Sequence, residues 1–197
     1  MQQTNKLRRR PVVSRILRDR GDLLVVTGLG SPTYDCAAAG DHPRNFYLWG
    51  AMGSSLTVGL GLALARPNER VLVVTGDGEI LMGFGAIATV GARAPGNLAV
   101  AVVDNEHYGE TGMQRTHTHA GIDLAGVARA AGFRETMTAQ TEEDVERAIP
   151  LLYSARGPVL VALKVAAERD PLVLPSWDGP LMKQRFRDAV LGADARL

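Results

Sequence analysis

The chain has 197 residues, a net charge of +1, and ordinary shares of apolar (46%) and charged (22%) residues. This length suffices for one domain with its own core, and the near-neutral charge gives no reason to expect nucleic acid or a charged surface as the main partner. The single cysteine, Cys36, excludes a disulfide framework, a Cys-rich zinc site and a Cys-held iron–sulfur cluster within this chain.

The N-terminal region contains the one basic cluster of the sequence, made of Lys6, Arg8, Arg9 and Arg10. We expect a solvated tail over residues 1–10, with docking against a partner as the minor alternative. No apolar run approaches the roughly 20 residues of a membrane helix, and no secretory signal pattern is evident. A lone cysteine, which we expect to be a small core residue, suits a reducing compartment, so we expect a cytoplasmic protein.

Short apolar runs alternate with helical patterns along the chain. The runs that predict buried strands are Leu23–Thr27, Val71–Thr75, Leu98–Val103 and Val159–Val165. Helical spacing predicts helices over residues 12–17, 56–65, 86–94, 123–131 and 141–155, the last with Thr141 as its N-cap. A C-terminal extension, residues 168–197, contains an amphipathic piece at 182–191 that packs on the domain or on a partner.

This alternation predicts a single α/β domain with a mainly parallel sheet and helices on both faces. Ligands of such sheets bind beyond the carboxyl ends of the strands. The segments that follow Thr27, Thr75 and Val103 are therefore the ones expected to carry chemistry, and all three are rich in glycine and polar residues.

Two of these segments carry a carboxylate and an amide at a defined spacing. Gly76-Asp77-Gly78 follows one strand, and residues 79–104, 26 in all, separate it from Asn105 after the next strand. Oxygen donors of this kind suit magnesium, and the glycines allow a diphosphate to approach the backbone. Taken alone, Gly-Asp-Gly is more often a simple turn, but the spaced asparagine and the strand context favour a site.

Four blocks of sequence resemble a known family. They are Asn45–Gly53, Gly76–Met82, Asp104–Gly109 and Thr111–Thr118. Together they resemble thiamine diphosphate-dependent enzymes, and most closely the β subunit of sulfopyruvate decarboxylase and the matching half of phosphonopyruvate decarboxylase, over roughly residues 12–166. The resemblance implies the thiamine diphosphate-binding fold, with the whole chain forming its pyrophosphate-binding domain.

The resemblance also implies roles for individual residues. Asp77, the side chain of Asn105 and the backbone carbonyl of His107 would bind Mg²⁺. Gly50 would offer its carbonyl to the aminopyrimidine, and Met52 would hold the cofactor bent beneath its thiazolium ring. The remaining residues expected to contact the cofactor are Gly28, Gly30, Ser31, Gly76, Gly78, Glu79, Tyr108 and Gly109.

Members of this family activate the cofactor with a glutamate from a different domain, across a subunit interface. The chain is too short for both domains, so the resemblance implies a separate α subunit that carries the pyrimidine-binding domain and the glutamate. We expect at least two chains of each kind. The expected function is that of the cofactor-binding subunit of a lyase, a decarboxylase of a small 2-oxo acid with a sulfonate or phosphonate tail.

Some positions depart from the family pattern. Glu79 stands where the wider family often has serine, so its acid either lies near the diphosphate or points away. Arg115, where proline is expected, would add a cation close to His117, and Met113 also differs. We expect His117 to donate a proton or bind substrate; zinc binding by His117 and His119 lacks an evident third ligand.

Other functions remain open at this point. The same cofactor serves carboligases such as acetolactate synthase, and an oxidoreductase would need an iron–sulfur cluster on another subunit. A non-catalytic cofactor-binding regulatory module is a further alternative on the same fold. A dinucleotide-binding domain is disfavoured, because Thr33 stands where the fingerprint that begins at Gly28 needs its third glycine.

Overall fold

The computed structural model describes residues 6–192 and 194. Its helices are α1 (Arg9–Leu17), α2 (Ser31–Ala38), α3 (Ser55–Ala65), α4 (Asp77–Met82), α5 (Gly85–Arg93), η1 (a 3₁₀ turn, His117–Ala120), α6 (Leu124–Ala130), α7 (Glu142–Tyr153) and α8 (Gly179–Leu191). Its strands are β1 (Leu24–Thr27), β2 (Asn45–Tyr47), β3 (Val71–Gly76), β4 (Leu98–Asp104), β5 (His107–Tyr108), β6 (Gln114–Arg115), β7 (Glu135–Ala139) and β8 (Val159–Lys164).

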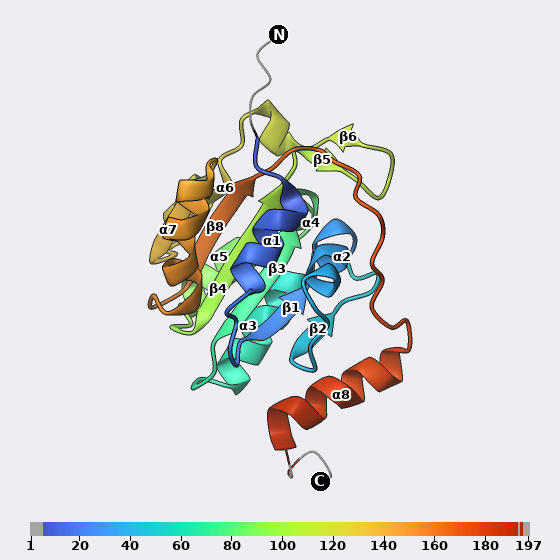
Figure 1. Ribbon diagram of the computed structural model, residues 1–197. Helices are drawn as coiled ribbons and strands as arrows, with labels where there is room; N and C mark the ends of the chain where they lie inside the picture. The colour runs from blue at the N-terminus through green and yellow to red at the C-terminus, as the bar shows by residue number, and fades with distance from the viewer. Residues whose placement is uncertain (1–5, 193, 195–197) are drawn as a thin grey trace.

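Six strands form one sheet in the order β2-β1-β3-β4-β8-β7, and every neighbouring pair is parallel (Figure 1). The central strands are buried along their whole length, which explains their continuous Val and Leu runs. The predicted α/β class with a parallel sheet is therefore confirmed, and all four predicted strands are present.

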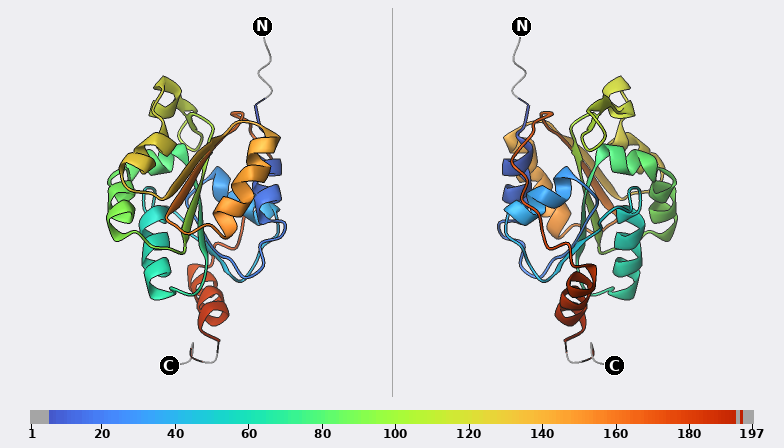
Figure 2. Two further views of the ribbon diagram at one scale, coloured as in Figure 1. Left: turned by 90° about the vertical axis from the view of Figure 1, so that its left-hand side faces the viewer. Right: turned by 90° about the vertical axis from the view of Figure 1, so that its right-hand side faces the viewer.

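Helices cover both faces of the sheet. Helices α1, α2 and α7 lie on one face, and α3, α5 and α6 lie on the other (Figure 2). Alternate residues of each strand feed two separate cores: Val25 and Leu72 pack on the α1 side, while Val26 and Val73 pack on the α3 side. The capping box at Thr141, whose hydroxyl accepts from the Asp144 N–H at 3.1 Å, starts α7 as predicted.

The C-terminal extension packs on the domain. Met182 of α8 is buried, and Phe186 lies 5.2 Å from Phe46 of β2, measured between ring centroids. The indole of Trp177 stacks on that of Trp49 at 4.3 Å. Helix α8 thus anchors at the β2 edge, where Figure 1 shows it below the body of the sheet.

The basic cluster near the N-terminus differs from the expected solvated tail, whose first five residues lie outside the described chain. The Arg9 side chain is buried, with Nε 2.5 Å from Asp35 of α2 and Nη2 3.1 Å from Asp170 of the extension. Arg10 also donates to Asp35, at 3.0 Å. Only part of the cluster is solvated, because two of its members neutralise a buried carboxylate that lies far along the chain.

No helix among the described residues combines the length and the apolar character that crossing a bilayer would require.

Candidate functional site

The order of the strands defines where a ligand would bind. The chain passes from β1 outward to β2, then crosses to β3 on the other side of β1 and continues outward through β4. The connections therefore reverse direction between β1 and β3, and a crevice opens there at the carboxyl ends of the strands. The segments after Thr27, Gly76 and Asp104 meet at this crevice.

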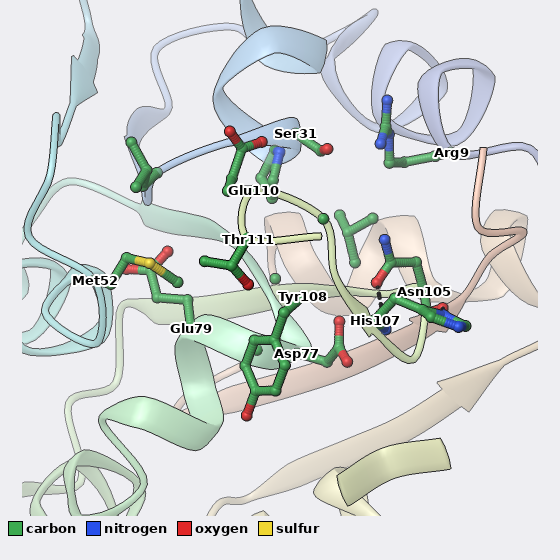
Figure 3. A pocket seen from close by; sticks show the side chains of 16 residues that line it. Arg9, Ser31, Met52, Asp77, Glu79, Asn105, His107, Tyr108, Glu110 and Thr111 are labelled. Atoms are coloured by element: carbon green, nitrogen blue, oxygen red, sulfur yellow. Dashed lines mark hydrogen bonds between the residues drawn. The ribbon is translucent and has the colours of Figure 1, made fainter. Parts of the chain in front are cut away.

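A pocket occupies this crevice (Figure 3). Ten of the residues singled out from the sequence line it: Ser31, Met52, Gly76, Asp77, Gly78, Glu79, Asn105, His107, Tyr108 and Gly109. Figure 3 shows Asp77, Asn105 and His107 on one side of it and Met52 and Glu79 on the other. The structure thus brings the Gly-Asp-Gly segment and the Asn105 segment together.

Asp77 is the most buried acid of the pocket. It is the first residue of α4, directly after β3, and is 1% exposed. Its Oδ2 accepts from Thr116 Oγ1 at 2.6 Å, and Thr118 Oγ1 lies 3.2 Å away. Burial and the neighbouring charge of Asp104 raise the pKa of Asp77 to about 6, although the two hydroxyls partly offset the rise.

No basic side chain of the described residues forms an ion pair with Asp77. A buried carboxylate without a counter-charge is costly, and a bound cation would remove that cost. Asn105 adds an amide oxygen from the adjacent strand end. A carboxylate, an amide oxygen and a backbone carbonyl are hard oxygen donors, so this set fits Mg²⁺.

Asn105 is held by a local turn. Its Oδ1 accepts from the His107 N–H at 2.9 Å, and its backbone oxygen lies 2.9 Å from His107 Nδ1. A carbonyl oxygen has two lone pairs, so the amide retains acceptor capacity for an ion. This turn explains why Asn105 and His107, both predicted ligands, lie together on one side of the pocket.

The glycines of the site serve different purposes. A Cβ atom on Gly76 or Gly109 would meet no atom closer than 3.8 Å, so both Cα atoms face open space that a diphosphate could use. A Cβ on Gly78 would lie 2.6 Å from the Tyr108 ring, and one on Gly28 would lie 1.3 Å from the Glu79 carboxylate. Gly78 and Gly28 therefore make room for side chains of this chain.

The Glu79 side chain lines the pocket but is hydrogen-bonded within the fold. It is 4% exposed, accepts from Thr75 Oγ1 at 3.0 Å and from the Ser55 N–H at 3.2 Å. The carboxylate also lies against Gly28, so whether it or only the Glu79 backbone faces the diphosphate stays a prediction.

Four of the predicted residues lie outside the pocket lining: Gly28, Gly30, Gly50 and His117. Gly30 faces the Glu110 side chain, which a Cβ would approach to 2.8 Å, and Gly50 has a φ of 84° and open surroundings. His117 is exposed at the start of η1. Its role stays a prediction.

Sequence reasoning missed several contributors. Thr116 and Thr118, 4% exposed each, point inward, whereas the intervening His117 and following His119 point outward. The polar alternation of Thr-His-Thr-His was the available signal. Among the described residues no three His, Cys, Asp or Glu side chains form a group that could hold a metal ion. The pocket lining also includes Arg9, Leu29, Pro32, Val103, Glu110 and Thr111.

The pocket is small for a complete cofactor. Its volume is about 50 Å³, whereas sites that enclose small-molecule ligands have roughly 300–1,000 Å³. It suits an ion and part of an anionic group, with the rest of a ligand lying over an open surface.

Comparisons with known proteins show the family to which the chain is similar. The model of the thiamine pyrophosphate enzyme C-terminal TPP binding domain matches residues 30–163. Sulfopyruvate decarboxylase subunit beta of Methanothermobacter thermautotrophicus is 36% identical, over 95% of this chain and 97% of that protein. Phosphonopyruvate decarboxylase of Streptomyces viridochromogenes is 41% identical over 84% of this chain, which spans 42% of that relative.

A solved structure shows the same fold. Benzoylformate decarboxylase from Polynucleobacter necessarius superposes with a TM-score of 0.71 at 19% identity, over 84% of this chain and 34% of that one.

Proposed function

We propose that this chain, which belongs to the family of thiamine pyrophosphate enzymes, binds thiamine diphosphate through Mg²⁺. With a second kind of chain it would form a two-component 2-oxo acid decarboxylase, of which it is one subunit. One observation carries this proposal. Asp77 is a buried carboxylate that forms no ion pair with any other described residue, and it shares a pocket with Asn105 and His107 at the point where the strand order reverses.

Each part of the pocket has a proposed task. Asp77, the Asn105 amide and the His107 carbonyl hold the ion, while Ser31, Gly76 and Gly109 accommodate the diphosphate. When bound, thiamine diphosphate supplies a carbon nucleophile and an electron sink for the loss of carbon dioxide from a 2-oxo acid. This chain orients the cofactor, through Met52 among others, and shields the charged end from water.

We propose that a second kind of chain completes the site and supplies the activating glutamate. Two findings support this. The Methanothermobacter relative, 97% of whose length this chain covers, is named as a subunit beta, and the pocket is too small to enclose the whole cofactor. Met82, the last residue of α4, and Phe84, the N-cap of α5, are 58% and 41% exposed, and Gly83 between them packs closely on Gly53. A partner surface would cover these apolar side chains.

The proposed substrate is a small 2-oxo acid with an anionic tail. Arg115 pairs with His107 across the β5–β6 hairpin, so a guanidinium lies one strand away from a proposed metal ligand. A planar cation there suits a sulfonate or phosphonate group. The relatives named for sulfopyruvate and phosphonopyruvate support the same chemistry.

The test is reconstitution. The chain is co-expressed with the product of a neighbouring reading frame that encodes a pyrimidine-binding domain, and 2-oxo acids are screened for carbon dioxide release with Mg²⁺ and thiamine diphosphate. Release without a condensed product supports a decarboxylase; a condensed product from an added aldehyde would instead assign a carboligase. Cofactor binding without turnover of any 2-oxo acid would favour a regulatory module.

A further inference from the structure

Glu106 has an unusual backbone conformation in the middle of the proposed metal-binding turn. Its φ is 63°, and only Ala94 and Met113 share a positive φ among the non-glycine residues described. This left-handed conformation strains a residue with a Cβ, whereas glycine adopts it freely. Glu106 stands between Asn105 and His107, so its φ determines how these two neighbours lie relative to each other.

Hydrogen bonds of the Glu106 backbone close the turn on both sides. The Glu106 N–H donates to Asp104 Oδ1 at 3.1 Å, and its carbonyl accepts from the Thr116 N–H at 2.9 Å. Within the turn, the His107 N–H donates to Asn105 Oδ1. The left-handed residue is therefore what allows the amide oxygen of Asn105 to meet the following backbone.

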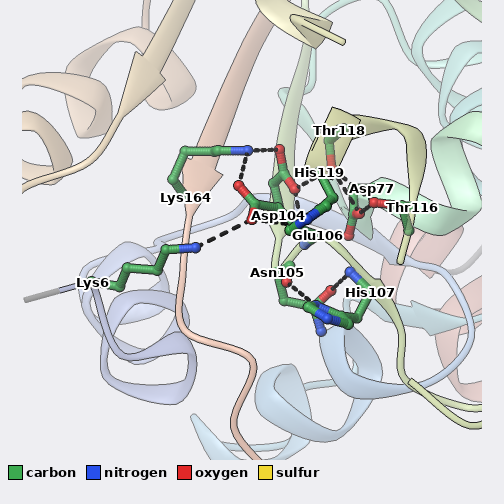
Figure 4. Close-up of polar contacts among 10 residues, drawn as sticks. All are labelled: Lys6, Asp77, Asp104, Asn105, Glu106, His107, Thr116, Thr118, His119 and Lys164. Carbon is green, nitrogen blue, oxygen red and sulfur yellow. Dashed lines mark hydrogen bonds and ion pairs between the residues drawn. The ribbon is translucent and has the colours of Figure 1, made fainter. Parts of the chain in front are cut away.

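The side chain of Glu106 is held by basic side chains from distant parts of the chain (Figure 4). Its Oε1 lies 2.8 Å from Lys164 Nζ, and its Oε2 lies 3.3 Å from Lys6 Nζ and 3.5 Å from His119 Nδ1. Lys164 also contacts Asp104 Oδ2 at 2.9 Å. Since Asp104 and Lys164 are register partners at the ends of β4 and β8, the sheet itself places this lysine.

We infer that Glu106 is a positioning residue, whose side chain is anchored by Lys164 so that the strained backbone between Asn105 and His107 holds its metal-binding shape. The inference rests on the proposed function, because it concerns the same ion. Glu106 does not itself bind the ion, because its carboxylate pairs with Lys164 and Lys6. It supports the metal site through the backbone conformation that it gives to its neighbours, the proposed ligands Asn105 and His107.

The test separates conformation from charge by comparing Glu106→Ala with Glu106→Gly. Both remove the carboxylate, but only alanine retains the strain of the left-handed region. The midpoint of a Mg²⁺ titration is measured by following thiamine diphosphate binding to the purified complex, and the melting temperature is measured alongside. The alanine variant should need about five- to tenfold more Mg²⁺ than the glycine variant.

Lys164→Met should raise the Mg²⁺ midpoint as Glu106→Ala does, because it removes the anchor. Glu146→Ala is the matched control, since Glu146 forms a remote ion pair of 2.6 Å with Arg15 and should leave the midpoint unchanged. Equal midpoints for the alanine and glycine variants would overturn the inference, even if both melt earlier. The proposed function fails separately, if Asp77→Ala and Asn105→Ala leave the Mg²⁺ requirement intact.

Discussion

The hydroxyl of Thr116 donates a hydrogen bond of 2.6 Å to Oδ2 of Asp77, although the two residues lie 39 positions apart. Thr118 lies 2.8 Å from Thr116 and donates to Asp104 Oδ1 at 2.8 Å (Figure 4). The two threonines therefore connect the start of α4 with the end of β4. In doing so they fix one oxygen of the Asp77 carboxylate.

Replacing these hydroxyls should weaken the metal site. Thr116→Val keeps the shape of the side chain but removes a hydrogen bond to a carboxylate, which is worth about 1.5–3 kcal/mol. We expect the Mg²⁺ midpoint for thiamine diphosphate binding to rise about tenfold, with a smaller rise for Thr118→Val. Thr89→Val, at an exposed helix position, is the control. A midpoint for Thr116→Val equal to that of the control would show that the hydroxyl does not support the site.

Asp77→Asn should stabilise the metal-free protein while abolishing metal binding. The pKa of Asp77 is raised by burial from 3.8 to about 6, so its favourable contribution is present below pH 3.8 and is lost as pH rises through about 6. Asparagine does not ionise, so the free energy of unfolding of the variant should not fall in this pH range. Above pH 6 it should exceed that of the wild type by at most about 3 kcal/mol. Urea unfolding in EDTA at pH 4 to 8 measures it. A stability difference that does not grow with pH would contradict the argument.

Gly28→Ala should destabilise the fold through Glu79. The new Cβ would lie 1.3 Å from Glu79 Oε2, so the buried carboxylate would have to leave its bonds to Thr75 and Ser55. We expect a loss of at least about 2 kcal/mol in the free energy of unfolding. Adding Glu79→Ser should recover most of it, since serine leaves the space free. If the double variant lost the sum of the free energies of unfolding that the two single variants lose, the contact would be disproved.

Arg9→Met should cost far more stability than Arg8→Met. Arg9 is buried against Asp35, which is fully buried and, among the described residues, would retain only Arg10 as a counter-ion. Breaking a buried ion pair costs about 3–5 kcal/mol, whereas Arg8, with a side chain 67% exposed, should contribute less than about 1 kcal/mol. Thermal unfolding of both variants makes the comparison, and equal melting temperatures would mean that Arg9 is not a structural ion-pair partner.

The central strands of the sheet could be predicted from the sequence, whereas the edge strands could not. Strands β3, β4 and β8 are buried on both faces, so their apolar runs are unambiguous. Strand β7, with the sequence Glu-Thr-Met-Thr-Ala, is a half-exposed edge strand without such a run, and β2 has only three residues. For helices α2 and α4 the sequence predicts loops, because both helices are short and follow a glycine in a segment rich in polar residues.

For the site, local patterns located the ligands but not their supports. Asp77 and Asn105 follow neighbouring strands, so their proximity was predictable from the sheet. Thr116, Lys164 and Arg9 act across long sequence separations, and their contacts depend on strand register and helix packing that no local pattern encodes. The prediction of a solvated tail is therefore wrong for Arg9, which is buried against Asp35.

Binding of thiamine diphosphate to the purified complex, measured calorimetrically with saturating Mg²⁺ and again with EDTA, tests the central claim most directly. The wild type should bind the cofactor only with Mg²⁺, and Asp77→Ala should bind it under neither condition. Glu143→Ala, which removes an exposed carboxylate from the first turn of α7, should behave as the wild type. Binding that persists in EDTA, or that survives Asp77→Ala in Mg²⁺, would contradict the assignment of the metal site to Asp77.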